Sequence, residues 1–227
     1  MNIELEYPKI EIGLQDTPPI THTTYPSIGI AAEQVANCLT AIRGVGAVAI
    51  NRHIVATENY QSWQTVGAFA LLALTDMEGR LARWGRKLQH KDEDVSRPVQ
   101  SYIDHLTDKG LVDGTMAAIA SRERNNGNTA YANAIAVATG ITIARDVATT
   151  ADRVAADIQG IDTRAQESGK QKAIKQYLAV GFALSPLAKP AIGKTAAAIG
   201  LGHSTHESIK SGWSLHQYFS NQRKNRQ

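Results

Sequence analysis

Apolar residues recur at the three- and four-residue spacing of an α-helix from Ala31 to about Phe219, and this long stretch contains few prolines. The prolines within it are Pro98, Pro186 and Pro190. Because proline inside a helix removes a backbone hydrogen bond and kinks or ends the helix, their scarcity permits long helices. No Asn-Gly or Asp-Gly turn separates two alternating apolar runs, which argues against β-hairpins. The sequence therefore predicts an all-α fold.

Groups of turn-forming residues divide this stretch into six helices. Lys91-Asp92-Glu93-Asp94 precedes Pro98, and Asn125-Asn126-Gly127-Asn128 lies between two apolar runs. We expect a bundle of six long helices within one domain, residues 31–220. The expected helices cover about residues 31–57, 62–90, 98–122, 128–158, 167–187 and 190–220.

The two ends of the chain differ from this stretch. Residues 1–30 contain Pro8, Pro18, Pro19 and Pro26 among threonines, which favours an irregular tail. Residues 221–227 form a basic tail. We interpret the basic tail as a solvated terminus and expect no nucleic-acid partner.

Composition excludes several classes of protein. The 227 residues carry a net charge of +3, 43% are hydrophobic and the mean hydropathy is −0.25. These values are typical of a globular chain and exclude a long disordered tract. A single cysteine, Cys38, excludes an internal disulfide and a zinc site built from cysteines.

Acidic residues at helical spacing suggest a metal site. Asp104 and Asp108 are four residues apart, so a helix places them on one face. Glu78, Gly79 and Ala82 also share a face with each other, and the two small residues leave room for a ligand or a helix. Like charges at this spacing repel, and a divalent cation would offset the repulsion. Hard carboxylate oxygens suit Mg²⁺ or Mn²⁺.

A second interpretation of these acids is a set of ordinary ion pairs on a solvated surface. Basic residues are abundant nearby and could supply the partners: Arg80, Arg83, Arg86, Lys87 and Lys109. Spacing alone does not separate the two interpretations.

The order of the acidic residues resembles the signature of the CDP-alcohol phosphatidyltransferase family. Glu78-Gly79-Arg80-Leu81-Ala82-Arg83 resembles the Asp-Gly-x-x-Ala-Arg part of that signature. Asp104 and Asp108-Lys109 resemble its closing Asp-x-x-x-Asp-Lys. Four more fragments occur in the family's order and most resemble phosphatidylglycerophosphate synthases: residues 37–43, Arg145-Asp146, Gly169-Lys170-Gln171-Lys172 with Gln176, and Ser211-Gly212 with Tyr218.

The chain departs from the family pattern at three signature positions. Thr75 stands at the first aspartate position, Glu78 at the second, and Gln100 replaces a glycine. The link from Arg83 to Asp104 is also longer than in the family. These departures favour an alternative in which a non-catalytic relative keeps the fold as a structural or interaction protein.

The resemblance implies a reaction and a set of site residues. It implies metal-dependent transfer of a phosphatidyl-type group from a CDP-alcohol to an acceptor alcohol, with release of CMP. Asp108 would be the general base, and a Mg²⁺ or Mn²⁺ site would be formed by Asp76, Glu78, Asp104 and Asp108. The nucleotide would contact Asn37, Thr40, Arg43, Gly79, Ala82 and Arg83, and the phosphates or the acceptor would contact Arg145, Lys170 and Lys172.

The resemblance also implies partners and a location. The donor would be CDP-diacylglycerol or a similar molecule, the acceptor a small alcohol with glycerol 3-phosphate as the first choice, and membrane lipids would surround six transmembrane helices. A homodimer is a further expectation. The helices are unusually polar for this fold, with Arg52, Asp113 and Arg145 inside them. This polarity favours a second alternative, a soluble helical bundle.

Overall fold

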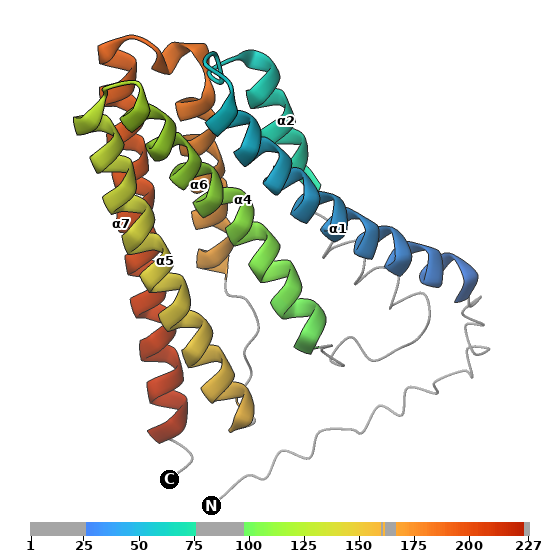
Figure 1. The fold of residues 1–227 in the computed structure, drawn as a ribbon. Helices are drawn as coiled ribbons and strands as arrows, with labels where there is room; N and C mark the ends of the chain where they lie inside the picture. Colours follow the sequence, from blue (N-terminus) through green and yellow to red (C-terminus); the bar gives the residue numbers. More distant parts are fainter. Residues whose placement is uncertain (1–25, 76–97, 160, 162–166, 225–227) are drawn as a thin grey trace, which may run out of the picture.

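The computed structural model describes residues 26–75, 98–159, 161 and 167–224. Within these residues the protein is entirely helical, which confirms the all-α prediction of six main helices (Figure 1). The helices are α1 (Pro26–Ala56), α2 (Trp63–Leu74), α4 (Pro98–Asn125), α5 (Thr129–Ile158), α6 (Glu167–Leu184) and α7 (Ala191–Lys224), and a short 3₁₀ turn, η2 (Pro186–Ala188), joins the last two.

Two helices begin at a proline. Pro26 opens α1 and Pro98 opens α4, because the first helical position needs no backbone N–H and suits the fixed φ of proline. The first helix therefore starts at Pro26 rather than at Ala31. Ser62 caps α2, since its Oγ accepts a hydrogen bond of 3.2 Å from the backbone N–H of Thr65. Residues 76–90 of the second expected helix lie outside the described residues.

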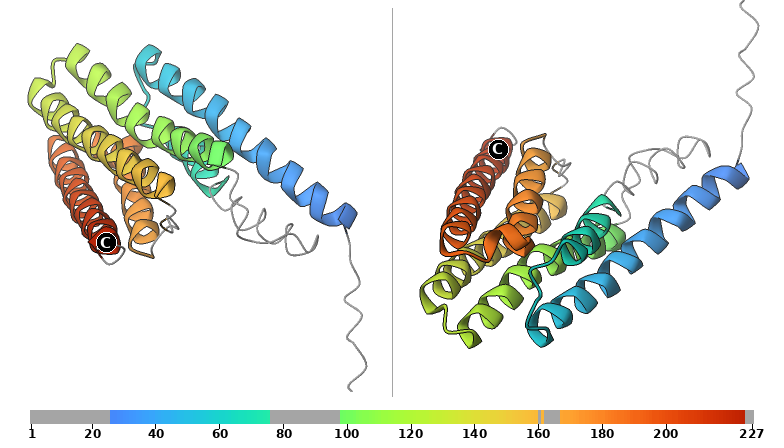
Figure 2. Two further views of the ribbon diagram at one scale, coloured as in Figure 1. Left: turned by 90° about the horizontal axis from the view of Figure 1, so that it is seen from below. Right: turned by 90° about the horizontal axis from the view of Figure 1, so that it is seen from above.

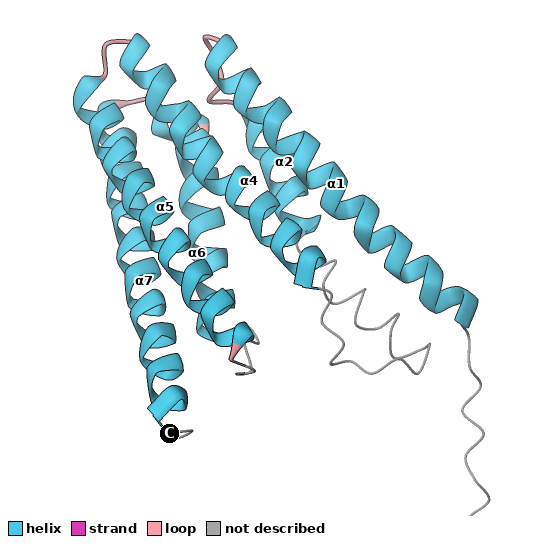
Figure 3. Ribbon diagram, turned by 60° about the horizontal axis from the view of Figure 1, so that its bottom comes forward, coloured by secondary structure: helices cyan, strands magenta, loops and turns pink. Residues whose placement is uncertain are grey.

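The six helices form a ring in which each one packs mainly against two neighbours, and α4 also touches α6 and α2 across the ring. Its order is α1, α4, α5, α7, α6 and α2, and α2 returns to α1 (Figures 1 and 2). Three connections, residues 57–62, 126–128 and 185–190, lie together at one end, which we call the closed end (Figure 3). The opposite end, where α1, α4 and α6 begin, is called the open end.

The main apolar core fills the half of the ring near the closed end. Its large members come from all six helices: Ile50, Ile54, Phe69, Leu111, Met116, Ile119, Ile135, Val180, Leu184 and Leu201. Gly46 of α1 allows α2 to approach closely, because a Cβ there would lie 2.4 Å from the Leu72 side chain. A smaller cluster around Phe219 joins the ends of α5 and α7 near the open end.

The polarity of the helices is also visible in their hydropathy. Within the described part of the chain, no helix is both long enough and apolar enough to cross a membrane. Some of the polar residues that lower the hydropathy of the helices lie inside the ring. Thr142 and Asp146 of α5 and Ser208 of α7 are all buried.

Candidate functional site

Between the two apolar clusters, the ring interior is lined by polar side chains at one level, which we call the polar layer. Cross-helix contacts define this level: Arg43 meets Thr75 and Asp108, Lys109 meets Asp146, and Arg145 meets Ser208. The layer comprises these residues and the neighbouring buried side chains, Thr40, Thr142, Thr149, Gln176, Ser204 and Thr205. Burying polar groups costs free energy unless they are paired, so such a layer suggests a function rather than a contribution to stability.

Arg43 is the centre of the layer on the α1 side. Its side chain is fully buried, and its Nη1 forms an ion pair with Asp108 of α4. Its Nε donates a hydrogen bond of 3.0 Å to the Thr75 hydroxyl, which in turn donates one of 2.6 Å to the Leu72 carbonyl oxygen. The planar guanidinium group suits two partners at once. Arg43 thereby fixes the Asp108 carboxylate, whose side chain keeps 28% of its surface exposed and is accessible to a ligand.

A second group of charges lies on the other side of α4. Lys109 Nζ lies 2.6 Å from Oδ2 of Asp146, and Arg145 Nη1 lies 2.5 Å from Oδ1 of the same carboxylate. Arg145 also crosses to α7, where its Nε donates a hydrogen bond of 2.9 Å to the Ser208 carbonyl oxygen. Asp108 and Lys109 are consecutive, so α4 joins the two charged groups.

The structure describes the side chain of only one predicted metal ligand, Asp108. Asp104 lies one helical turn earlier in α4, although its side chain is not described, and Asp76 and Glu78 lie outside the described residues. Among the described side chains, no three or more His, Cys, Asp or Glu residues group to hold a metal ion. Position and carboxylate chemistry fit Mg²⁺ or Mn²⁺ at Asp104 and Asp108, and the metal site stays a prediction.

The predicted nucleotide contacts divide into three groups. Thr40 and Arg43 are buried within the polar layer, beside Asp108. Asn37 is exposed on α1. The third group, Gly79, Ala82 and Arg83, lies outside the described residues.

The predicted phosphate contacts are only partly described. Arg145 lies in the polar layer, with 14% of its side chain exposed. Lys170 and Lys172 belong to the beginning of α6, and their side chains are not described. The sequence did not predict that Lys109 and Asp146 would pair, because a contact between two helices leaves no local pattern in the sequence.

A different charged cluster, also not predicted, lies at the closed end. The Glu123 carboxylate is buried and accepts hydrogen bonds of 2.7 Å from the Tyr60 hydroxyl and from Asn128 Nδ2. Lys194 Nζ lies 2.8 Å from Glu123 Oε2. Burial and the neighbouring Glu123 carboxylate raise the pKa of Tyr60 and of Tyr131 well above the usual tyrosine value. This Glu123 cluster ties two connections of the closed end, residues 57–62 and 126–128, to the beginning of α7.

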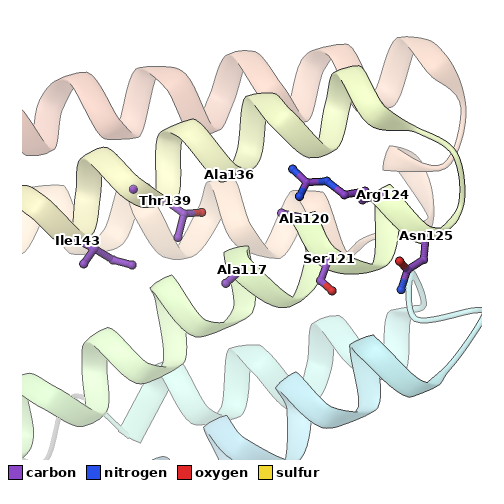
Figure 4. A pocket seen from close by; sticks show the side chains of 9 residues that line it. Ala117, Ala120, Ser121, Arg124, Asn125, Ala136, Thr139 and Ile143 are labelled. Carbon is purple, nitrogen blue, oxygen red and sulfur yellow. The ribbon is translucent and has the colours of Figure 1, made fainter.

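A cavity of about 390 Å³ lies between α4 and α5 (Figure 4). Alanine side chains and Gly140 form much of its wall, and Arg124 and Asn125 lie at the end nearest the α4–α5 connection. Arg124 Nη2 donates a hydrogen bond of 2.9 Å to Asn133. The cavity contains none of the predicted site residues.

Comparison with known proteins identifies the family. The family model described as CDP-alcohol phosphatidyltransferase matches residues 33–203, about three quarters of the chain. The matched range contains every predicted site residue and both charged groups of the polar layer. A search of curated proteins gave no match. The extent of the family match shows that the chain belongs to the CDP-alcohol phosphatidyltransferase family.

Proposed function

We propose that this protein transfers a phosphatidyl group from CDP-diacylglycerol to glycerol 3-phosphate, as phosphatidylglycerophosphate synthases do. Membership of the family makes the chain a transferase that acts on a CDP-alcohol and an acceptor alcohol. The observation that carries the proposal is the polar layer, where the accessible Asp108 carboxylate is held by Arg43, beside the cations Lys109 and Arg145.

Asp108 has the role of general base in the proposed reaction. The acceptor hydroxyl gives its proton to the Asp108 carboxylate while its oxygen forms a bond to the phosphorus that carries the lipid. The bond from this phosphorus to the oxygen of CMP breaks, and CMP leaves with the electron pair. Arg43 holds the carboxylate in position, which reduces the entropy that the transition state must lose.

A divalent cation completes the proposed site. Asp104 and Asp108, with Asp76 and Glu78, would hold Mg²⁺ or Mn²⁺, which would neutralise negative charge on the diphosphate. Thr40 and Arg43, with Asn37, Gly79, Ala82 and Arg83, would contact the nucleotide. Arg145, Lys170 and Lys172 would contact the acceptor or the lipid phosphate.

We also propose that the bundle is membrane-bound, as the family usually is, with its outer surface in contact with lipid. The exposed residues of α5 between Ala130 and Val154 are all uncharged, and Val137 and Val147 are each more than 60% exposed. The charged Arg145 and Asp146 of the same helix face inward. This inside-out pattern is typical of helices in lipid, where ionisable groups face the interior of the bundle. Cell fractionation followed by a carbonate wash tests it, and recovery in the soluble fraction would contradict it.

A homodimer is part of the same proposal. The uncharged outer face of α5 carries small residues, including Ala134, Gly140 and Ala148, that permit close packing of a second helix. Light scattering of the purified protein in detergent measures the oligomeric state, and a monomeric mass would contradict this part.

The decisive experiment measures CMP release from CDP-diacylglycerol by purified protein. Mg²⁺ or Mn²⁺ is supplied, or removed with a chelator, and the acceptors include glycerol 3-phosphate, inositol, inositol phosphate, serine and glycerol. We expect metal-dependent release that is fastest with glycerol 3-phosphate and is lost in Asp108→Asn. A different preferred acceptor would correct the substrate, and folded protein without release for any acceptor would identify a non-catalytic relative.

A further inference from the structure

The cavity between α4 and α5 opens onto the outer surface of the ring, and we call it the α4–α5 groove. Its exposed lining residues include Ala117 of α4 and Gly140 and Ile143 of α5. Along α4 the lining runs from Ala117 to Asn125, a rise of about 12 Å. Part of an extended hydrocarbon chain fits along a groove of this length.

The wall of the groove is apolar over most of its length. Alanine, glycine and isoleucine form much of it, and the Thr139 hydroxyl already donates a hydrogen bond of 2.8 Å to the Ile135 carbonyl oxygen. A Cβ added at Gly140 would meet no atom within 4 Å, so no described side chain fills the space next to this residue. Apolar surface of this kind gains free energy when an apolar ligand replaces water on it.

Arg124 is the only charged residue among those that line the groove, and it lies at the end nearest the α4–α5 connection (Figure 4). Its Nη2 donates to Asn133 Oδ1 at 2.9 Å, which holds the guanidinium group in place. Among the described residues, no carboxylate pairs with Arg124. Its remaining N–H groups can therefore donate to a phosphate, the anion that the planar guanidinium group fits well.

The charges around the closed end favour an anionic head group over a zwitterionic one. Outside the Glu123 cluster, the described residues there that water reaches include four cations, Arg52, Arg122, Arg124 and Lys189, and one acid, Glu58. Basic residues at a membrane surface attract anionic lipids. They repel the ammonium group of a phosphatidylcholine.

A second copy of this chain is a poorer match to the groove. Every exposed residue of α4 and α5 between Gly110 and Ala151 is uncharged except Arg124. A symmetric dimer built across the groove would therefore offer Arg124 no exposed carboxylate from these helices. Ala134 and Ala148, two of the small residues proposed above for a homodimer, lie about 120–160° around α5 from the lining residues at position 136, so a dimer on that face leaves the groove accessible.

We propose that the α4–α5 groove binds an anionic phospholipid of the membrane, with the lipid phosphate at Arg124 and one acyl chain along the groove toward Ile143. The lipid would be a bound lipid and not the substrate, because the groove contains none of the predicted site residues. The inference rests on the proposed membrane location and is independent of the proposed transfer reaction.

Thermal unfolding of the purified full chain in dodecyl maltoside tests the site. Dioleoyl phosphatidylglycerol should raise the melting temperature by about 5 °C at saturation, dioleoyl phosphatidylcholine by less than about half as much, and inorganic phosphate not at all. Gly140→Leu fills the groove and Arg124→Gln removes its cation, so each should lose at least about half of the shift with phosphatidylglycerol. The matched controls, Gly202→Leu and Arg52→Gln, change an exposed glycine with open space beside it and an exposed cation outside the groove, and should keep the whole shift.

A phosphatidylglycerol with a diazirine on its acyl chain locates the site independently of stability. Photolysis should label the peptides of α4 and α5 that line the groove, and Gly140→Leu should abolish this labelling. Labelling confined to the polar layer, or equal melting shifts in the wild type and Gly140→Leu, would overturn the inference.

Light scattering of the same samples separates a lipid from a second copy in the groove. If Gly140→Leu converted a dimer to a monomer and left the lipid shift unchanged, the groove would be a dimer interface and the inference would be wrong. Arg124→Gln serves if Gly140→Leu does not fold, since Arg124 is exposed near the end of α4. If the wild type transfers to no acceptor, the proposed reaction fails, and the lipid measurements still decide the inference.

Discussion

The polar layer and the Glu123 cluster both place a carboxylate and a cation inside the same ring of helices, but they differ in what surrounds the charges. Glu123 is 1% exposed, and its two oxygens are occupied by Tyr60, Asn128 and Lys194. It borders the main apolar core. In the polar layer, Asp108 keeps 28% of its side chain exposed and the neighbouring buried residues are threonines, serines and glutamine.

This difference separates stability from function within one fold. A buried charge that is fully surrounded by partners has no capacity left for a ligand, and it holds the connections of the closed end in place. A carboxylate that is held by Arg43 and keeps 28% of its side chain exposed can still accept a proton. We therefore expect substitutions in the polar layer to change activity first, and substitutions in the Glu123 cluster to change stability first.

The largest effect should follow from Arg43→Met. Loss of the guanidinium group removes the contact that orients Asp108, and displacement of a catalytic group by about 1 Å can lower a rate about 100-fold. We expect CMP release to fall by about that factor, measured with saturating donor and acceptor. Arg43→Lys keeps the charge but loses the forked geometry, so its rate should be intermediate. If Arg43→Met released CMP as fast as the wild type, Arg43 would not be the residue that holds Asp108 in position for catalysis.

The next effect concerns the closed end. Lys194→Met leaves the Glu123 carboxylate buried without its cation, and breaking a buried pair in this way costs about 3–5 kcal/mol. We expect the free energy of unfolding to fall by about that amount in denaturant titrations, while the rate of CMP release per folded molecule is unchanged. The double variant Lys194→Met with Glu123→Gln should recover part of the loss. A single variant that is stable but inactive would reverse the comparison between the two clusters.

The helices could be predicted well from the sequence, because each depends on local spacing. The ranges 98–122 and 128–158 differ from α4 and α5 by three residues or fewer at either end. The start of α1 was placed too late, since Pro26 was taken as incompatible with a helix although proline suits the first position. The family resemblance came from the order of short motifs and was confirmed by the family match.

The charged groups were predictable only in part, because their partners come from distant helices. The motif identified Asp108 and Arg43 separately, but nothing in the sequence indicated that they pair across 65 positions. Glu123, in the run Ser121-Arg122-Glu123-Arg124-Asn125, has the composition of an exposed helix end. Its burial follows from Tyr60, Asn128 and Lys194, which meet only when two connections of the closed end come together with the beginning of α7.

A smaller effect separates two buried tyrosines of the closed end. Tyr60 donates a hydrogen bond of 2.7 Å to Glu123, whereas the Tyr131 hydroxyl has no hydrogen-bond partner among the described residues. Tyr60→Phe should therefore lower the free energy of unfolding by about 1–3 kcal/mol at pH 7, and Tyr131→Phe should leave it nearly unchanged. Equal losses in the two variants would show that the hydroxyl contact to Glu123 contributes nothing.

The raised pKa values of Tyr60 and Tyr131 also predict how the free energy of unfolding depends on pH. Their pKa values in the folded state lie above the usual 10.0, so the folded protein retains protons that the unfolded chain releases. Stability should be constant just below pH 10 and should fall as the pH rises above it, by up to about 1.4 kcal/mol per pH unit for each group. Each phenylalanine variant should remove the contribution of one group from this slope, measured by denaturant titration between pH 9 and 11.

The smallest effect is expected on the outside of the ring. Lys175 and Glu207 join α6 to α7 at the level of the polar layer, but their N–O distance is 3.5 Å and their side chains are 44% and 30% exposed. Exposed pairs of this kind contribute about 0–1 kcal/mol because water and salt screen them. Lys175→Met should change the free energy of unfolding by no more than that, with a smaller change at high salt, and should leave transfer intact. If Lys175→Met lowered the free energy of unfolding as much as Lys194→Met does, the burial of an ion pair would not decide how much it contributes to stability in this protein.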